Sequence, residues 1–504
     1  MTKIPNLVRM VEEGEIEIPE FQREFVWSNN QVRDLAESIY RGYPIGLLIL
    51  YRVPRGQSPS RERYWVLDGQ QRLLSLTLIM KGKVEAIRRG RRATIRLDIW
   101  FDPVNEKFEI RQPRTDEERR KWIKLSELLQ IEKRLDLEKL LRERGYNSEE
   151  QDRISALWAT FKADYKVPVH ELSEDLSLDD LGNVFVRVNF AGTRVRGTDV
   201  YSTMIAVTYK DVVKELRDFC TQLPIEIDYG VLIRTFVALL TDGKVKLGNR
   251  VFEQASKLRE VLEGKKALLK DIVDKVKEST KLSIEMLQRR GIIKLPSESV
   301  IPVMSYYIHK KGRLPPEEEE GLFKWFVLAT FFERYSASAE TRLDEDLATI
   351  KNGGNYRDLI ENIRRREGDL RERILAYIDE GNYNELLLYA LLRQSGARDF
   401  LTGEILTQAN STVHHIFPRK RLAGTSYTEL VDDIGNITLL THASNQKLSA
   451  DLPENYLQKV PPEVLRAHYI PEDRELWRLE NVETFIRERR ERLKEAVEEF
   501  FRTL

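Results

Sequence analysis

The chain has 504 residues, too many for one ordinary hydrophobic core, so two or three domains are expected. Lysine plus arginine and aspartate plus glutamate each number 82, so net charge gives no argument for DNA binding, and affinity for DNA would have to come from local patches. The single cysteine, Cys220, excludes an intrachain disulfide framework and a multi-cysteine zinc site, and the absence of a long apolar run or a signal-peptide core predicts a cytoplasmic protein without a membrane segment.

The first predicted elements follow an aromatic segment in which Gln22-Arg23 lies between Phe21 and Phe25. Ser28 is expected to cap a helix that ends near Gly42 and has an apolar stripe of Val32, Leu35, Ala36 and Ile39. Residues 47–51 are expected to form a buried strand. A Gln-Arg pair alone is more typical of a surface than of a site.

A second signal lies at residues 64–80, where an aromatic and apolar run, an Asp-Gly turn and a stretch with helical spacing predict strand, tight turn and helix. The turn carries Asp68-Gly69-Gln70-Gln71-Arg72. This geometry directs backbone N–H groups at whatever lies above the turn, which suits a phosphate. Arg72 adds a bidentate donor, and the two glutamines add neutral donors and acceptors.

Basic runs could provide the local patches. The run at residues 88–92 precedes a strand expected over 94–101, a turn at 102–105 and a further strand at 107–111, and a basic hairpin edge could contact phosphates. The runs at 364–366 and 487–492 lie among acidic residues, so they are expected to be solvated helix faces.

Residues 206–375 are rich in Leu, Lys, Glu and Arg with helical periodicity, which predicts a helical segment. Its simplest role is a scaffold that spaces two active domains. The alternative is a coupling element that transmits the state of a nucleotide bound near the turn at residues 68–72 to the C-terminal active domain. Within this segment Cys220 is expected to be a small apolar residue in a helix.

The segment around His414 and His415 contains the groups that a hydrolytic metal site needs. With His442, which follows shortly after, this part of the chain holds three of the six histidines. Phosphodiester cleavage requires a cation to stabilise charge on the phosphate and a neutral imidazole to deprotonate water. The alternative is that both are ordinary strand residues, one of them buried. The following Ile-Phe-Pro, the Gly-Asn-Ile-Thr-Leu-Leu strand and the Asn-x-Lys helix favour the catalytic interpretation.

This spacing resembles the HNH, or ββα-metal, nuclease fold. The resemblance implies that His414 is a metal ligand, His415 the general base, Asn436 the residue that orients the base segment, and Asn445 the second ligand. His442 is kept as a substitute ligand or a phosphate contact, since it lies three residues before Asn445 on the expected helix. The implied cation is Mg²⁺ or Mn²⁺, and a neutral imidazole at a position where the family often has an acid favours a softer ion.

The segments at residues 21–27 and 68–72 together resemble the ParB/sulfiredoxin-like domain of GmrSD-type restriction proteins, a group that includes SspE- and BrxU-like defence proteins. Residues 184–193 are similar to the Phe-x-x-x-Asn-x-x-Gly-Thr element of that family. The resemblance implies a domain that binds and hydrolyses a nucleoside triphosphate and senses modified DNA, with Asp68 and Arg72 catalytic. The implied nucleotide-binding residues are Gln22, Arg23, Asp68, Gly69, Gln70, Gln71 and Arg72.

We therefore expect an α+β, mostly helical protein with a ParB-like domain at 1–205, a helical middle at 206–375 and an HNH domain at 376–504. The expected function is a nucleotide-regulated, metal-dependent endonuclease that restricts modified double-stranded phage DNA. The alternative is a nucleotide-gated DNA-binding switch with a non-catalytic HNH-like module. The oligomeric state is left open, with a homodimer among the options.

Overall fold

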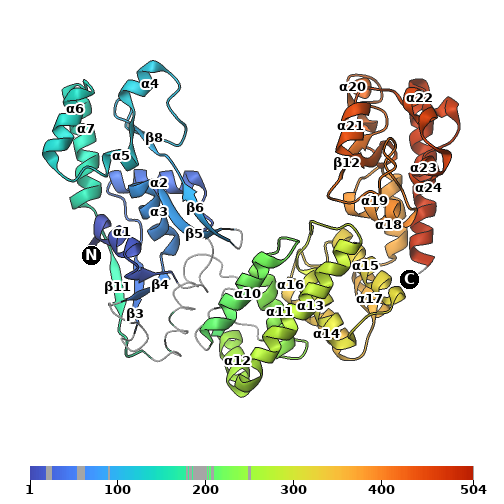
Figure 1. The fold of residues 1–504 in the computed structure, drawn as a ribbon, viewed down its shortest axis with the longest axis horizontal. Coiled ribbons are helices and arrows are strands. Elements are labelled where there is room, and N and C mark those ends of the chain that lie inside the picture. The colour runs from blue at the N-terminus through green and yellow to red at the C-terminus, as the bar shows by residue number, and fades with distance from the viewer. Residues whose placement is uncertain are drawn as a thin grey trace. The chain divides into compact units, whose positions relative to one another are not determined.

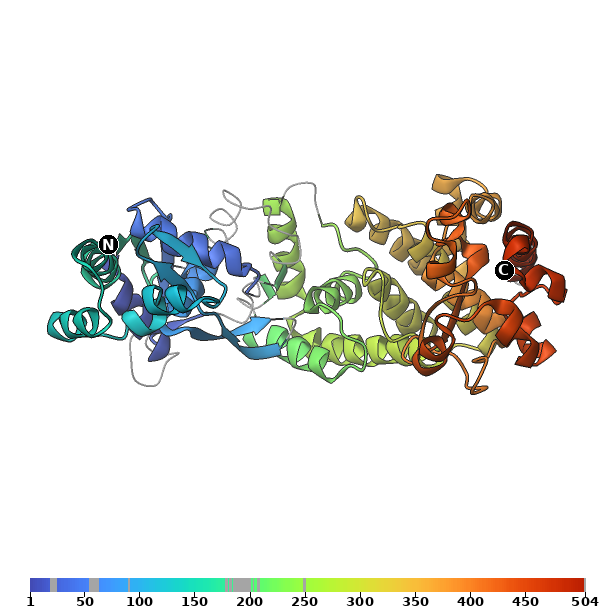
Figure 2. The same cartoon turned by 90° about the horizontal axis from the view of Figure 1, so that it is seen from above.

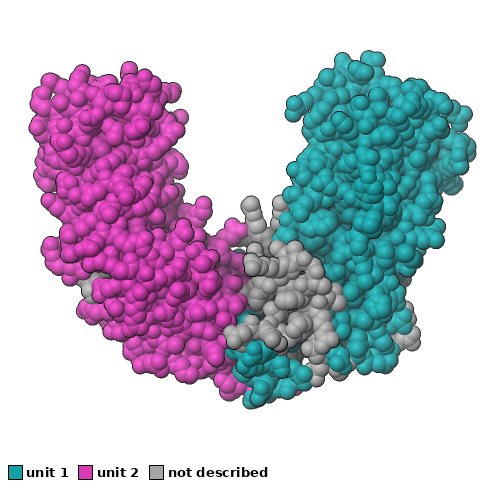
Figure 3. Space-filling model, turned by 180° about the vertical axis from the view of Figure 1, so that it is seen from behind, with its two compact units in different colours: residues 1–221, 247–264 teal, residues 222–246, 265–504 magenta. Residues whose placement is uncertain are grey.

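The computed structural model describes residues 1–18, 25–53, 63–88, 91–176, 180, 184, 201–202, 204–205, 209–247 and 251–502. The chain forms two compact units (Figure 3). Unit 1 comprises residues 1–221 and 247–264, and unit 2 comprises 222–246 and 265–504. Helices predominate and the strands form small sheets, so the expected mixed, mostly helical class is confirmed at this level. None of the described helices combines the length and apolar character that crossing a membrane requires.

Unit 1 is built around a four-stranded sheet in the order β11-β3-β4-β2 (Figure 1). The central pair β3–β4 is antiparallel, whereas the outer pairs are parallel. The expected buried strand corresponds to β3, and the expected strand, turn and helix correspond to β4, Gly69 and α3. The bounds are β2 (Ile16–Glu17), β3 (Leu48–Arg52), β4 (Tyr64–Asp68), β11 (Val169–Leu172) and α3 (Gln70–Lys81).

The tight turn between β4 and α3 requires glycine at position 69. Gly69 has φ of 89°, a left-handed conformation that side chains disfavour. A Cβ atom there would also lie 2.2 Å from Cδ2 of Leu48. The chain can therefore turn sharply from the sheet into α3 only without a side chain at this position.

The helix expected after Ser28 is α2 (Asn29–Tyr40). Ser28 and Gln31 form a capping box, in which each side chain accepts from the backbone N–H of the other residue. The stripe that starts at Val32 is buried in the core of unit 1, and α2 and α1 (Ile4–Glu12) both pack on α3. This capped, one-sided helix was readable from its sequence.

The strand expected over residues 94–101 is instead two strands, β6 (Arg91–Arg96) and β7 (Trp100–Asp102). They belong to different sheets, because β6 pairs with β5 (Lys83–Arg88) and β7 pairs with β8 and β9. The chain leaves the hairpin at Leu97, whose N–H donates to the carbonyl of Gly82. The other elements that unit 1 contributes are β1 (Thr2–Lys3), β8 (Lys107–Glu109), α4 (Asp116–Lys121), β9 (Ile123–Lys124), α5 (Leu125–Leu128), α6 (Arg134–Glu143), α7 (Ser148–Ala159), η2 (Thr160–Asp164), β10 (Lys166–Val167), α10 (Lys210–Gln222) and α12 (Val251–Gly264).

The described residues between 209 and 395 form helices and no strand (green to orange in Figures 1 and 2), as their periodicity predicted. Cys220 is buried in α10, as expected. The expected middle segment is divided between the two units, and the three-domain boundaries remain a prediction. The helices of unit 2 in this region are α11 (Tyr229–Leu240), η3 (Lys266–Leu268), α13 (Leu269–Arg289), α14 (Val300–Lys311), α15 (Pro316–Phe331), α16 (Ala339–Lys351), α17 (Tyr356–Glu367), α18 (Leu370–Asp379) and α19 (Glu385–Gln394).

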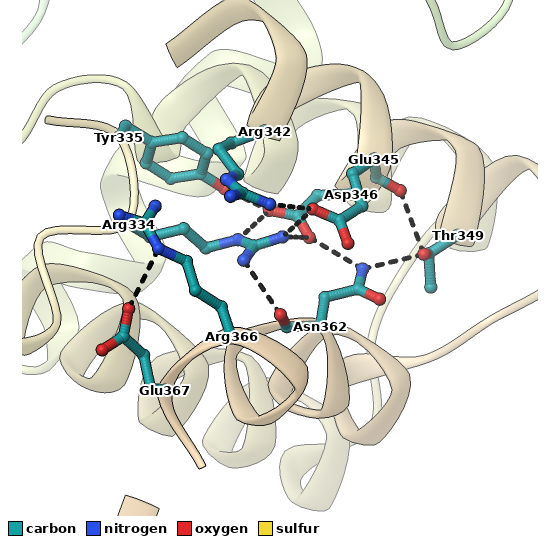
Figure 4. A network of polar contacts seen from close by, with 9 residues as sticks. All are labelled: Arg334, Tyr335, Arg342, Glu345, Asp346, Thr349, Asn362, Arg366 and Glu367. Carbon is teal, nitrogen blue, oxygen red and sulfur yellow. Dashed lines mark hydrogen bonds and ion pairs between the residues drawn. The ribbon is translucent and has the colours of Figure 1, made fainter. Parts of the chain in front are cut away.

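A buried polar network ties α16 and α17 to the turn after α15 (Figure 4). The guanidinium of Arg334 donates to both carboxylate oxygens of Asp346 at 2.7 Å, and these side chains are 1% and 0% exposed. The hydroxyl of Tyr335 and the amide of Asn362 donate to the same carboxylate. Because a buried charge left without its partner costs ~3–5 kcal/mol, this pair holds the three elements together.

The expectation that residues 487–492 form a solvated helix face is wrong at Arg489. The run lies on α24 (Val482–Arg502), and Arg489 is 0% exposed. It falls at helical spacing between Phe485 and Leu493, which places it on the buried stripe. The run at 364–366, by contrast, is 55%, 68% and 40% exposed on α17, so its solvated character is confirmed.

Candidate functional site

The segment that carries the paired histidines folds as strand, loop, strand and helix in unit 2. These elements are β12 (Ser411–His415), β13 (Ile437–Thr441) and α21 (His442–Leu448), and the loop contains α20 (Arg419–Leu422), η4 (Thr428–Leu430) and η5 (Ile434–Asn436). The strands are antiparallel, with His414 opposite Thr438. Successive strand residues face opposite ways, so His414 is 1% exposed whereas the side chain of His415 is 23% exposed.

His414 and Asn445, the two expected metal ligands, lie in contact. Nδ1 of His414 is 2.8 Å from Oδ1 of Asn445. The amide orientation follows from Nδ2, which donates to the carbonyl of Val413 at 3.0 Å. Burial lowers the pKa of His414 to about 4, so the imidazole is neutral at physiological pH. A neutral imidazole is the form that can offer a lone pair to a cation.

This donor pair fits a divalent cation that takes both atoms as neighbouring ligands. Two adjacent ligands of an octahedral ion at ~2.1 Å lie about 3.0 Å apart, close to the observed separation. Among the described residues no cluster of three or more His, Cys, Asp or Glu side chains could hold a metal. The chemistry of the site is therefore one imidazole nitrogen and one amide oxygen.

His415, the expected base, pairs with Asp432 in the loop. Its Nε2 lies 2.9 Å from Oδ1 of Asp432, and Nη2 of Arg419 donates to both oxygens of that carboxylate at 2.7 Å. The hydrogen bond from His415, and then Arg419, lower the pKa of Asp432. Because a carboxylate can only accept here, Nε2 of His415 carries a proton in this contact, and in the neutral form of an imidazole the other nitrogen, here Nδ1, keeps a lone pair.

Asn436 fastens the segment that follows His415. Its Oδ1 accepts from the N–H of Phe417 at 2.8 Å, and its Nδ2 donates to the carbonyls of Phe417 and Val431 at 3.1 and 3.0 Å. Asn436 is 0% exposed. It therefore acts on the backbone next to the base and does not reach the ligand pair.

The start of α21 is held by Asp399, which lies before β12. Its carboxylate accepts from the N–H of Thr441 at 2.8 Å and the hydroxyl of Ser444 at 2.5 Å, at the positive end of the helix. Burial alone would raise the pKa of Asp399, but these bonds and those from Thr402 lower it to about 2. The clasp fixes the helix that presents Asn445.

Arg489 and His468 contact β13 and the residues just before it, and Nδ1 of His468 lies 2.7 Å from the hydroxyl of Thr438. Arg489 donates to the carbonyls of Ile434, Gly435 and Ile437 at 2.9, 3.1 and 2.7 Å, and burial lowers its pKa to about 9. His468 is 0% exposed, with Nε2 2.8 Å from the carbonyl of Arg398. Burial lowers the pKa of His468 to about 3, so it is a neutral structural histidine. The side chain of His442 is exposed on α21 and forms no hydrogen bond to a described residue, so its expected role remains a prediction.

In unit 1 the structure brings Asp68 and Arg72 together. Nη2 of Arg72 donates to Asp68 at 2.8 Å, and Nη1 donates to the carbonyls of Ile45 and Leu47 at 3.2 and 2.8 Å. A Cβ atom on Gly46 would lie 2.4 Å from Nη1, so the backbone approaches the guanidinium closely. Both terminal nitrogens of Arg72 thus contact protein groups around the turn.

The glutamines of the same turn differ in role. Oε1 of Gln71 accepts from the N–H groups of Val26 and Trp27 at 2.9 and 3.3 Å, which ties α3 to the segment before α2. Gln70 is 8% exposed at the first position of α3. Gln22 and Arg23, two of the expected nucleotide-binding residues, lie outside the described residues.

Two family models match the chain. Residues 4–205 match the GmrSD restriction endonuclease N-terminal domain, and residues 365–496 match the GmrSD restriction endonuclease C-terminal domain. The chain belongs to the GmrSD restriction endonuclease family. A relative described as uncharacterized protein MJ0686, from Methanocaldococcus jannaschii, is 22% identical over 552 residues, which cover 93% of this chain and 91% of the relative.

The GmrSD assignment confirms the family resemblance and the order of its two domains. The N-terminal GmrSD match includes Asp68 and Arg72, and the C-terminal GmrSD match includes β12, β13 and α21. Sequence reasoning missed Asp432 and Tyr456, which contact His415 and His414. Asp432 lies four residues before Asn436 and could have been considered. Tyr456 lies 42 residues from His414 and had no local signal.

Proposed function

We propose that the C-terminal domain of this GmrSD protein is a metal-dependent HNH endonuclease that cuts modified double-stranded phage DNA under the control of a nucleoside triphosphate. Family membership supports nuclease activity on DNA. The observation that carries the proposal is the contact of His414 with Asn445 on the elements that also hold His415. It unites a cation-binding donor pair and a candidate base.

In this proposal His415 is the general base. The contact with Asp432 holds Nε2–H and orients the ring, so Nδ1 can accept a proton from the attacking water. Asn436 keeps the backbone after the base in place through its contacts with Phe417. The His415 side chain is partly exposed, as a group that meets a large substrate must be.

His414 and Asn445 would hold the cation, which is Mg²⁺ or Mn²⁺. When bound, the cation stabilises charge on the phosphate in the transition state. With two protein ligands, most coordination positions remain for water and phosphate oxygens, so binding is weak without DNA. The mixed imidazole and amide donor set favours Mn²⁺ over Mg²⁺.

DNA would approach across the loop that follows His415. There α20 presents exposed Lys420 and Arg421 directly after Arg419. These side chains form the local basic patch that a chain with no net charge needs for phosphate contacts. Such contacts position the duplex and carry no sequence information, which leaves recognition of the modification to another part of the protein.

The nucleotide would bind at the turn before α3. The structure supports a role for Asp68 and Arg72 in shaping this turn, since their ion pair and the contacts of Arg72 with Ile45 and Leu47 brace it. Gln70 and Gln71 begin the helix, where a phosphate group is favoured by the helix dipole.

Cleavage assays on modified and unmodified phage DNA, each with and without nucleoside triphosphate and divalent cation, test this function. The proposal predicts cleavage that needs the cation, prefers modified DNA and responds to the nucleotide. Equal cleavage of both DNAs in the absence of nucleotide would leave the nuclease but remove its proposed control.

A nucleotide-gated DNA-binding switch is the second candidate. One observation favours it: the contact between His414 and Asn445 can also be an ordinary hydrogen bond if Nδ1 carries the ring proton. The HNH-like module would then be structural. Nucleotide-dependent DNA binding without cation-dependent nicking would establish the switch.

A further inference from the structure

A row of four polar groups, of which Asn445 is half-buried and the other three are buried, runs through the proposed metal centre. Oδ1 of Asn445 lies 2.8 Å from Nδ1 of His414, Nε2 of His414 lies 3.2 Å from the hydroxyl of Tyr456, and that hydroxyl lies 2.9 Å from the carbonyl of Ile416. His414 and Tyr456 are 1% and 3% exposed. The row therefore contains three contacts in a region from which water is largely excluded.

The row holds fewer protons than contacts. Both ends, the amide oxygen of Asn445 and the carbonyl of Ile416, can only accept. The neutral imidazole of His414 supplies one proton and the hydroxyl of Tyr456 supplies one. Two protons cannot satisfy three contacts, so one pair of acceptors must face each other.

Tyr456 presents an acceptor, and not a donor, to His414. Among the described residues its hydroxyl is the one donor to the carbonyl of Ile416, and a buried carbonyl left without a donor is destabilising. When Tyr456 donates to Ile416, its oxygen lone pair faces Nε2 of His414 and can accept a hydrogen bond from Nε2–H. The contact without a proton is the one between His414 and Asn445 when Nε2 carries the ring proton, and the one between His414 and Tyr456 when Nδ1 carries it.

We propose that Tyr456 is a positioning residue that holds His414 in the Nε2–H tautomer and so reserves Nδ1 for the divalent cation. The two facing acceptors, Nδ1 and the amide oxygen of Asn445, repel each other until a cation binds both. This inference rests on the proposed metal centre and names the residue that prepares it. Metal-bound histidines commonly donate their other ring N–H to such a partner, whose removal costs roughly 10- to 100-fold in metal affinity.

Titration of the full chain with Mn²⁺, followed by the electron paramagnetic resonance signal of the free ion, tests the inference. Tyr456→Phe keeps the ring that packs against Phe400 and His414 but removes the hydroxyl. It should weaken Mn²⁺ binding by about 10-fold or more. The matched control is Tyr389→Phe, which removes another buried hydroxyl that donates to a carbonyl, that of Arg290, outside the centre.

The outcomes separate this inference from the proposed function. Weaker binding by Tyr456→Phe and unchanged binding by Tyr389→Phe support the role of Tyr456. Equal Mn²⁺ affinity of wild type and Tyr456→Phe overturns that role while leaving the metal centre intact. No Mn²⁺ binding by the wild type, either alone or with a DNA oligonucleotide present, overturns the metal centre itself, and the inference with it.

Two further variants test the same tautomer without changing Tyr456. An asparagine side chain places its oxygen at the bond position of histidine Nδ1, and a glutamine side chain places its oxygen at that of Nε2. His414→Asn should therefore retain more Mn²⁺ affinity than His414→Gln. The reverse order would show that Nε2 is the liganding nitrogen and would refute the role given to Tyr456.

Discussion

Removing the side chain of Asn436 should both destabilise the candidate centre and stop DNA cleavage. Asn436→Ala deletes three buried hydrogen bonds, one with the N–H of Phe417 and two with the carbonyls of Phe417 and Val431. At a net ~1–1.5 kcal/mol each, the loss is about 3–4.5 kcal/mol. The largest effect should fall on the backbone after His415, so the base loses its position before the domain unfolds.

Hydrogen exchange followed by mass spectrometry measures this effect locally, which matters because a chain of two units need not unfold in one step. Peptides covering residues 411–441 should exchange faster in Asn436→Ala. Asn436→Asp should be at least as damaging at neutral pH, because it replaces two donated bonds by an anion facing two carbonyls.

Asn362→Ala is the matched control, since Asn362 is also buried and donates to Asp346 and Thr349 in the network of Figure 4. It should destabilise its own helices and leave exchange at 411–441 unchanged. Unchanged exchange at 411–441 in Asn436→Ala, or full nicking activity, would refute the role assigned to Asn436.

Three further predictions concern stability, metal and nucleotide. Asp399→Asn should lower the free energy of unfolding by about 2 kcal/mol at pH 7, because folding lowers the pKa of Asp399 to about 2. In denaturant titrations the difference in unfolding free energy between wild type and variant should disappear as the pH falls from ~5 to below 2. A difference in unfolding free energy that stays constant across that pH range would contradict the role of the Asp399 carboxylate at the start of α21. EDTA should abolish cleavage without changing the circular dichroism spectrum, and cleavage in excess chelator would exclude the metal mechanism. Arg72→Lys should impair nucleotide binding and turnover, because an ammonium cannot span Asp68 and the carbonyls of Ile45 and Leu47. If calorimetric titration gave the variant the same nucleotide affinity and turnover as the wild type, the nucleotide would control cleavage through another part of the protein.

Local patterns predicted the elements whose determinants are adjacent in sequence. The capping box at Ser28 and the left-handed Gly69 mark the N-terminal ends of α2 and α3. The residues that form these caps lie within three positions of the helix start. The paired strands and helix at 411–448 were predicted from the resemblance of their spacing to the HNH fold, and the structure forms two strands and a helix there. Asn436, predicted as an orienting residue, makes its contacts within 19 residues of itself.

Contacts set by tertiary packing could not be predicted. Tyr456 reaches His414, and Arg489 reaches the carbonyl of Ile434, only because segments 42 and 55 residues apart fold together. The charged run at 487–492 predicted a solvated helix face, which is wrong at Arg489. Its guanidinium can be buried because three backbone carbonyls near β13 accept its hydrogen bonds. In unit 1 the hydrogen bonds from Arg72 to the carbonyls of Ile45 and Leu47 depend on how the chain before β3 packs against α3.

The initial rate of nicking of supercoiled plasmid in Mn²⁺ tests most directly whether His415 is the base of a hydrolytic centre on β12. His415→Ala should lower that rate by ~10²- to 10⁴-fold with the fold and nucleotide hydrolysis intact. The control His170→Ala removes an exposed histidine of β11 in unit 1 and should nick at the wild-type rate. A His415→Ala protein that nicks DNA as fast as the wild type would contradict the account.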